Sequence, residues 1–152
     1  MPDDDDLSGR TVAYYNGRAE AFWEGTRDHD VSQNIDALLR HIEGDGPHRI
    51  LDVGCGPGRD LMRFKQLGHE PVGLDGAARF VELARLHSGC EVLHQDFLRL
   101  DLPAESFDGV FANASLFHVQ LSELPRVMRQ LWASLRPGGV LFSSNPRGDN
   151  VE

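Results

Sequence analysis

The sequence predicts an α/β fold, in which an open, doubly wound parallel sheet carries helices on both faces. Short apolar segments alternate with amphipathic helical segments along most of the 152 residues, and Gly or Pro residues stand at many of the junctions. A glycine-rich turn follows the first apolar segment of this alternation. Parallel strands need right-handed crossover connections, and the sheet is expected to be open and doubly wound. Ligands in open α/β sheets bind beyond the carboxyl ends of the strands, so the functional residues are expected there.

The N-terminal part of the chain precedes this alternation. Residues 1–10, with the acidic run Asp3–Asp6, are expected to form a disordered tail, and residues 11–152 a single domain. Two amphipathic helices should follow the tail. Apolar residues recur at helical spacing in both: Val12, Tyr15, Ala19, Phe22 and Trp23 in the first, and Ile35, Leu38, Leu39 and Ile42 in the second.

The alternating part contains five expected strands and three expected helices. The strands are placed at 49–53, 71–75, 91–94, 107–112 and 140–144. Two of the helices are placed at 58–67 and 77–87, the first ending at Gly68. The third helix has apolar residues from Leu124 to Leu135, with Ser122 as its expected N-cap and Pro125 in its first turn. The prolyl-glycyl-glycine run 137–139 should end it.

The turn after the first strand has the composition of a ligand-binding loop. Gly54, Gly56 and Gly58 alternate along it, which lets the backbone turn sharply and approach a ligand closely. Asp75 follows the second strand, 21 residues beyond Gly54, where a carboxylate can accept hydrogen bonds from both hydroxyls of a ribose. Dinucleotide-binding turns read G-x-G-x-x-G, whereas here the third glycine comes one residue early and Arg59 follows it. This favours an adenosyl ligand without a pyrophosphate, and a tight turn with no ligand is the alternative.

Five blocks in order resemble the motifs of class I S-adenosylmethionine-dependent methyltransferases of the small-molecule type. They are residues 50–58 (ILDVGCGPG), 73–75 (GLD), 95–97 (QDF), 107–113 (FDGVFAN, continuing through LFHV at 116–119) and 135–141 (LRPGGVL). The resemblance covers about residues 10–145. It implies a Rossmann-like doubly wound sheet with strand order 3-2-1-4-5, and S-adenosyl-L-methionine (SAM) as the cofactor, with S-adenosyl-L-homocysteine (SAH) as its product.

The resemblance also implies roles for single residues. The three glycines would line the methionine and ribose end of the cofactor, and Asp52 would support the turn or reach the methionine ammonium through water. Asp75 would bind the ribose, Asp96 the adenine amino group, and Asn113 with Ala114 would border the sulfonium. The full set of implied cofactor-binding residues is Tyr14, Asp52, Gly54, Cys55, Gly56, Gly58, Asp75, Gly76, Asp96, Phe97, Asn113 and Ala114.

Several of these residues have a plain structural alternative. Asp96 could cap a turn, and Phe97 could belong to the core. Tyr14 and Tyr15 would lie on a helix that covers the site, or one of them could be core and the other surface. No catalytic residue is assigned: His118 and Asn113 are the candidates, and His118 could equally pack behind the fourth strand. His29, between two aspartates, could reach the substrate or lie in a solvated loop.

Charge and composition narrow the class of partner. The formal net charge is −9, and Lys65 is the only lysine, so binding to nucleic acid is disfavoured. No apolar run approaches the roughly 20 residues of a membrane span, and a membrane partner is not expected. Cys55 and Cys90 show neither metal-ligand nor disulfide spacing, which favours reduced thiols, a cytoplasmic protein and no metal site.

The predicted function is therefore transfer of a methyl group from SAM to an N, O or S atom of a small molecule. A non-catalytic SAM-binding module or inactive subunit, and an NAD-dependent oxidoreductase, are the alternatives. The family fold ends in a hairpin of strands 6 and 7, which is missing from these 152 residues, so the chain is expected to be C-terminally truncated. The exposed edge of strand 5 would then be open to self-association.

Overall fold

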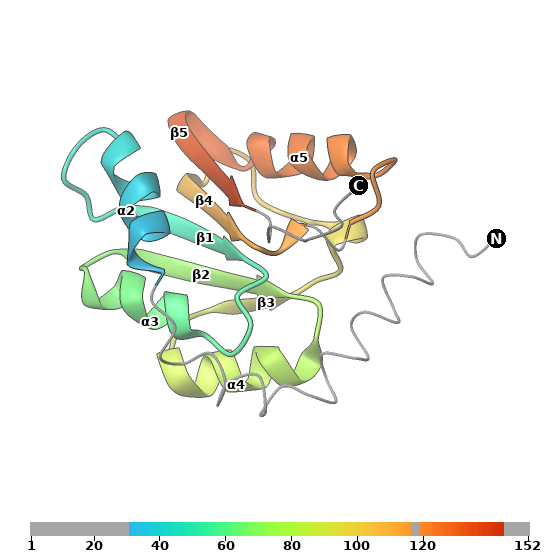
Figure 1. The fold of residues 1–152 in the computed structure, drawn as a ribbon, viewed down its shortest axis with the longest axis horizontal. Helices are drawn as coiled ribbons and strands as arrows, with labels where there is room; N and C mark the ends of the chain where they lie inside the picture. Colours follow the sequence, from blue (N-terminus) through green and yellow to red (C-terminus); the bar gives the residue numbers. More distant parts are fainter. Residues whose placement is uncertain (1–30, 117–118, 145–152) are drawn as a thin grey trace.

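The structure, a computed structural model, describes residues 31–116 and 119–144. Within them, five parallel strands form one sheet in the order β3-β2-β1-β4-β5, with β1 at its centre (Figure 1). The strands are β1 (Arg49–Val53), β2 (Glu70–Asp75), β3 (Val92–His94), β4 (Phe107–Asn113) and β5 (Leu135–Ser144). The predicted fold class and strand order are confirmed.

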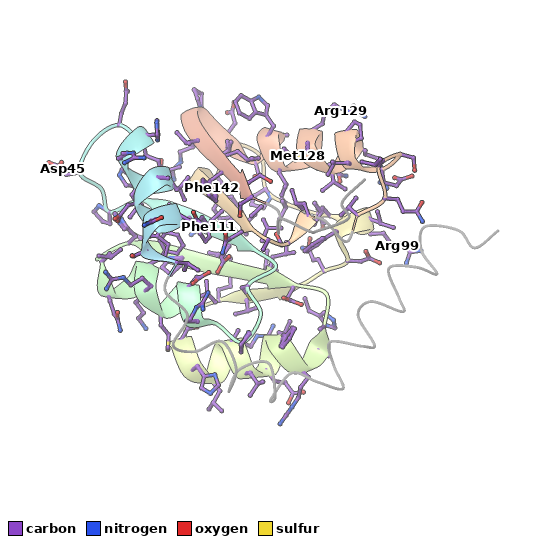
Figure 2. The ribbon with its side chains drawn as sticks, in the orientation of Figure 1. Asp45, Arg99, Phe111, Met128, Arg129 and Phe142 are labelled. Atoms are coloured by element: carbon purple, nitrogen blue, oxygen red, sulfur yellow. The ribbon has the colours of Figure 1, made fainter. Side chains whose placement is uncertain are left out.

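Helices cover both faces of this sheet. They are α2 (Ser32–His41), α3 (Arg59–Gln66), α4 (Ala78–Ser88), α5 (Leu124–Ala133) and the short 3₁₀-helix η1 (Phe97–Arg99). Val127 and Leu131 of α5 pack on one face, against Leu51 of β1 among others. Figure 2 shows Met128 on the side of α5 that is turned to the sheet and Arg129 on the outer side. The central strands read as continuous apolar runs because both of their faces are buried.

The opposite face is covered by α2, α3 and α4. Its largest side chains are aromatic: the Phe111 ring of β4 lies 5.3 Å from the Phe64 ring of α3, edge to face, and 5.3 Å from the Phe142 ring of β5, stacked (Figure 2). Ile35 and Leu38 of α2 pack into the same cluster. The predicted second N-terminal helix is thus confirmed as α2, and it packs against β4 and β5.

Two predictions about the third helix are wrong. Ser122 is not its N-cap: that position is taken by Glu123, without a side-chain capping bond, because the chain already turns where Glu123 N–H and Leu124 N–H both donate to Gln120 O. Nor does the run 137–139 end the helix, which stops at Ala133. The main-chain N–H groups of Glu105 and Ser106 bind the last carbonyls, of Ala133 and Ser134, and the chain then enters β5 directly.

Residues 137–139 lie instead within β5, where the register with β4 shifts between Phe107 and Gly109. Beyond this irregularity β5 pairs in order, from Val140 with Gly109 to Ser144 with Asn113. In the described part of the sheet β5 is an edge strand, and pairing of another chain along it stays a prediction. The expected tail, the first helix and the residues Tyr14, Tyr15, His29 and His118 lie outside the described residues.

Candidate cofactor-binding site

The glycine turn after β1 is held in a conformation that only glycine adopts easily. Gly54, Gly56 and Gly58 all have positive φ, of 74°, 56° and 99°. A Cβ on Gly54 would lie 2.5 Å from Ser115 Cβ and 3.4 Å from Phe97 Cζ. The loops that follow β1, β3 and β4 therefore meet at Gly54, and a side chain there would separate them.

Asp75 ties this turn to the end of β2. Its side chain is buried, its Oδ2 accepts from Gly56 N–H at 2.9 Å, and its Oδ1 accepts from Ala77 N–H at 2.9 Å. Burial raises the pKa of this carboxyl, although hydrogen bonds from Ala77, Gly56 and Gly76 and the nearby His94 act in the opposite direction. A carboxylate has about four acceptor positions, so Asp75 can hold the turn and still accept from a ligand hydroxyl.

Asp52 lies in β1, two residues before Gly54, and one of its carboxyl oxygens lacks a hydrogen-bond partner among the described residues. Its side chain is 2% exposed, and this oxygen is Oδ2. Burial raises the pKa of Asp52 well above its usual range, Asp60 and Asp75 add to the rise, and Arg59 opposes it. A neighbouring cation or hydrogen-bond donor would stabilise the charged form of such a buried carboxyl group.

Asp96 and Phe97 lie at the end of β3, on and beside η1. Asp96 Oδ1 accepts from Leu98 N–H at 2.9 Å, so the capping role that the sequence left open is confirmed. Phe97 is half-buried: it packs against the α5-side core, and its ring faces Gly54. Contact of either residue with adenine stays a prediction.

Asn113 ends β4 and is fixed in orientation by two neighbours. Its Oδ1 accepts from Asn34 Nδ2 of α2 at 2.8 Å and from Ser144 Oγ of β5 at 2.7 Å. The next residue, Ala114, has a φ of 55°, and its N–H donates to Ser144 O at 2.8 Å. The ends of β4, β5 and α2 are thus joined at the edge of the site.

The remaining predicted residues have structural roles that differ from one another. A Cβ on Gly58 would lie 2.9 Å from Ala84 Cα, so this glycine lets α3 and α4 approach closely. The thiol of Cys55 is buried in the core cluster with Leu61 and Ala84, which raises its pKa, and it points away from the site. Gly76 directly follows Asp75, and its carbonyl oxygen lies 3.1 Å from His94 Nε2. Ligand contacts by Cys55 and Gly58 are accordingly expected through the backbone alone.

Two residues that the sequence did not single out belong to this region. Ser115 is buried with its Oγ unpartnered among the described residues, and Asn34 orients Asn113. Ser115 lies between the two parts of the fourth-strand block, 107–113 and 116–119, so its position after the strand could have indicated it. Nothing in the sequence near Asn34 signals a partner 79 positions away. No group of three or more His, Cys, Asp or Glu side chains suited to a metal ion occurs in the described ranges.

A family model described as a methyltransferase domain matches residues 50–139, more than half of the chain. The chain belongs to the methyltransferase-domain family. This confirms the resemblance that the five sequence blocks carry. The matched residues run from β1 into β5 and include every described site residue except Asn34 and Ser144.

The chain is similar to curated proteins that are named as methyltransferases. It is 30% identical over 135 residues to a sterol 24-C-methyltransferase of Clavispora lusitaniae, covering 84% of this chain and 34% of that protein. It is 31% identical over 146 residues to a malonyl-[acyl-carrier protein] O-methyltransferase of Erwinia pyrifoliae, covering 95% and 52%. The chain thus spans about a third to a half of these relatives.

The fold is also found in a solved structure described as a DhpI–SAH complex. The TM-score is 0.72 at 25% sequence identity, and the likeness covers 89% of this chain and 67% of the other.

Among the described residues, no helix has the length and apolar character to cross a membrane.

Proposed function

We propose that this chain binds SAM at the carboxyl ends of β1, β2 and β4, and that the protein transfers the methyl group to a small-molecule acceptor. The observation that carries the proposal is the pair of buried carboxylates, Asp52 and Asp75, beside a left-handed glycine turn. Family membership and the SAH-bound structural neighbour support it.

The residues present fit SAM better than a dinucleotide. The unpartnered Asp52 Oδ2 suits the positive charge of an amino-acid ammonium, and Asp75 keeps an acceptor position for a ribose hydroxyl. In a dinucleotide-binding turn of the form G-x-G-x-x-G the third glycine would stand at position 59, where this chain has Arg59 after Gly58. This disfavours the NAD-dependent alternative.

When bound, SAM supplies an electrophilic methyl group on a positively charged sulfur. The chain's contribution is to hold the reactants in line and to exclude water, and proximity of this kind can lower a barrier by ~7–11 kcal/mol. Asn113, oriented by Asn34 and Ser144, lies where the acceptor would approach. A general base is required only for an acceptor that must lose a proton, which is the role considered for His118.

The acceptor is proposed to be a small molecule rather than a nucleic acid. The net charge of −9 disfavours a polyanion, and the relatives are named for a sterol and for a malonyl group on a carrier protein. Transfer to N, O or S in the cytoplasm stays a prediction, and the sterol relative, named for a carbon position, adds carbon to the acceptor atoms to be tested.

Calorimetric titration of the 152-residue chain with SAH tests the binding step. Saturable binding of SAH with no binding of NADH is the expected result. Labelled methyl transfer from SAM into a metabolite extract then separates an enzyme from the non-catalytic alternative. Absence of SAH binding would overturn the proposal, whereas SAH binding without methyl transfer would favour the non-catalytic alternative for these 152 residues.

A further inference from the structure

Ser115, the second residue after β4, carries a buried hydroxyl that the protein itself does not satisfy. The residue is 5% exposed, and its Oγ has no hydrogen-bond partner among the described residues. Leaving such a group unpaired is energetically costly. Native proteins pair almost all buried polar groups, so an unpaired one needs an explanation, and a ligand contact is one.

The position of Ser115 suggests the contact. Its Oγ lies 3.3 Å from the point where a Cβ on Gly54 would stand, and Phe97 Cζ lies 3.4 Å from the same point. The hydroxyl is therefore placed against the glycine turn and near the ring that the family resemblance assigns to the adenine. Asp52, with the other unpartnered oxygen of this region, lies two residues before Gly54.

The other buried serines show that the fold can satisfy such hydroxyls. Ser88 Oγ donates to Ala84 O at 2.6 Å, and Ser134 Oγ donates to Leu131 O at 2.6 Å. Both lie at helix ends, where a free carbonyl is within reach. Ser115 follows a strand instead, and its Oγ has no hydrogen-bond partner among the described residues.

We propose that Ser115 is a further cofactor-binding residue, whose hydroxyl forms a hydrogen bond with the adenosyl ligand held by the glycine turn. The inference rests on the proposed function. A serine hydroxyl both donates and accepts, so it can pair with either a hydroxyl or a ring nitrogen of that ligand. Ser115 then contributes to ligand affinity at the expense of the stability of the ligand-free protein.

The test combines SAH calorimetry with thermal denaturation of the ligand-free chain. Ser115→Ala is expected to lower SAH affinity about three- to tenfold, since one hydrogen bond is lost. The same variant should leave the Tm unchanged or raise it, because an unpaired buried hydroxyl has been removed. Ser134→Ala is the matched control, with a lower Tm and unaltered SAH affinity.

The outcomes separate the inference from the proposed function. SAH affinity of Ser115→Ala equal to that of the unaltered chain would overturn the inference, and so would a fall in Tm like that of Ser134→Ala. Ser115→Cys, which keeps the side-chain volume with a weaker hydrogen-bonding group, should bind SAH with intermediate affinity, and it serves if the alanine variant does not fold. If the unaltered chain fails to bind SAH, the proposed function falls, and the inference falls with it.

Discussion

The two ends of the sheet differ in how well their polar side chains are paired. At the carboxyl ends of the strands, Asp52 Oδ2 and Ser115 Oγ have no partner among the described residues. At the amino ends, Asp108 of β4 accepts from Arg49 N–H at 2.9 Å and pairs with the Arg136 guanidinium at 3.2 Å. There, too, His69 Nδ1 accepts from His48 N–H at 3.0 Å.

This difference indicates that the amino ends of the strands contribute to stability and that the carboxyl ends bind a ligand. Local rules of polar satisfaction are commonly broken at functional sites, where the ligand completes the pairing. A third buried side-chain atom without a partner among the described residues, Gln130 Oε1, lies on α5. Substitutions that are matched between the two ends can break or sharpen the comparison.

The largest effect is expected at Gly54. Gly54→Ala adds a Cβ 2.5 Å from Ser115 Cβ at a φ of +74°, so strain and overlap act together, for a loss of about 2–5 kcal/mol of stability. Gly68→Ala, before β2, has a similar φ of +92° but nothing within 4 Å of the new Cβ, and should lose only about 1–2 kcal/mol. Denaturant unfolding of both variants measures the difference, and equal losses would contradict the close approach at Gly54.

Replacement of Asp75 should affect ligand binding. Asp75→Ala removes the acceptor proposed for the ribose hydroxyls and the partner of Gly56 N–H, and should weaken SAH binding by about 1–3 kcal/mol. Asp108→Ala at the opposite end should lower stability and leave SAH affinity unaltered. Calorimetry on both variants gives the answer, and normal SAH binding by Asp75→Ala would remove the ribose assignment.

Replacement of Asp52 should increase stability. Because burial raises its pKa, the folded state holds a proton that the unfolded state has released, and stability falls as pH rises from the ordinary value of 3.8 through the raised pKa. Asp52→Asn should abolish this fall and add about 1–3 kcal/mol at neutral pH. Thermal denaturation between pH 5 and 8 tests this, with Asp108→Asn as the control that should lose stability.

The smallest effect concerns His69 at the amino ends. Burial, together with His48, lowers the pKa of His69 from 6.5, so the unfolded state takes up the proton first and stability declines as pH falls below 6.5 toward the lowered pKa. His69→Asn keeps an acceptor for His48 N–H without titrating in this range, so its Tm should change less between pH 7.5 and pH 5.5. An identical pH profile for both proteins would show that His69 does not contribute.

Periodicity and turn chemistry predicted most of the fold. The strand from Arg49 to Val53 lies where its apolar run stands, and α3 ends before Gly68 as expected. Errors occurred where a local signal competed with tertiary hydrogen bonds. The run at 137–139 is a strong helix-stop signal. The helix ends before it, however, because main-chain N–H groups of residues 105–107 donate hydrogen bonds to the carbonyls of Ala133 and Ser134.

The sequence by itself determined the order of elements, the left-handed turn at Gly54 and the acid at the end of β2, because period, glycine spacing and strand ends are local properties. Only the tertiary structure decided that Gly58 lets two helices approach and that Asn34 orients Asn113. Only the tertiary structure, too, places the Ser115 hydroxyl beside Gly54 without a hydrogen-bond partner among the described residues. These contacts join residues 26 to 79 positions apart, so they depend on strand register and helix docking, which no local pattern encodes.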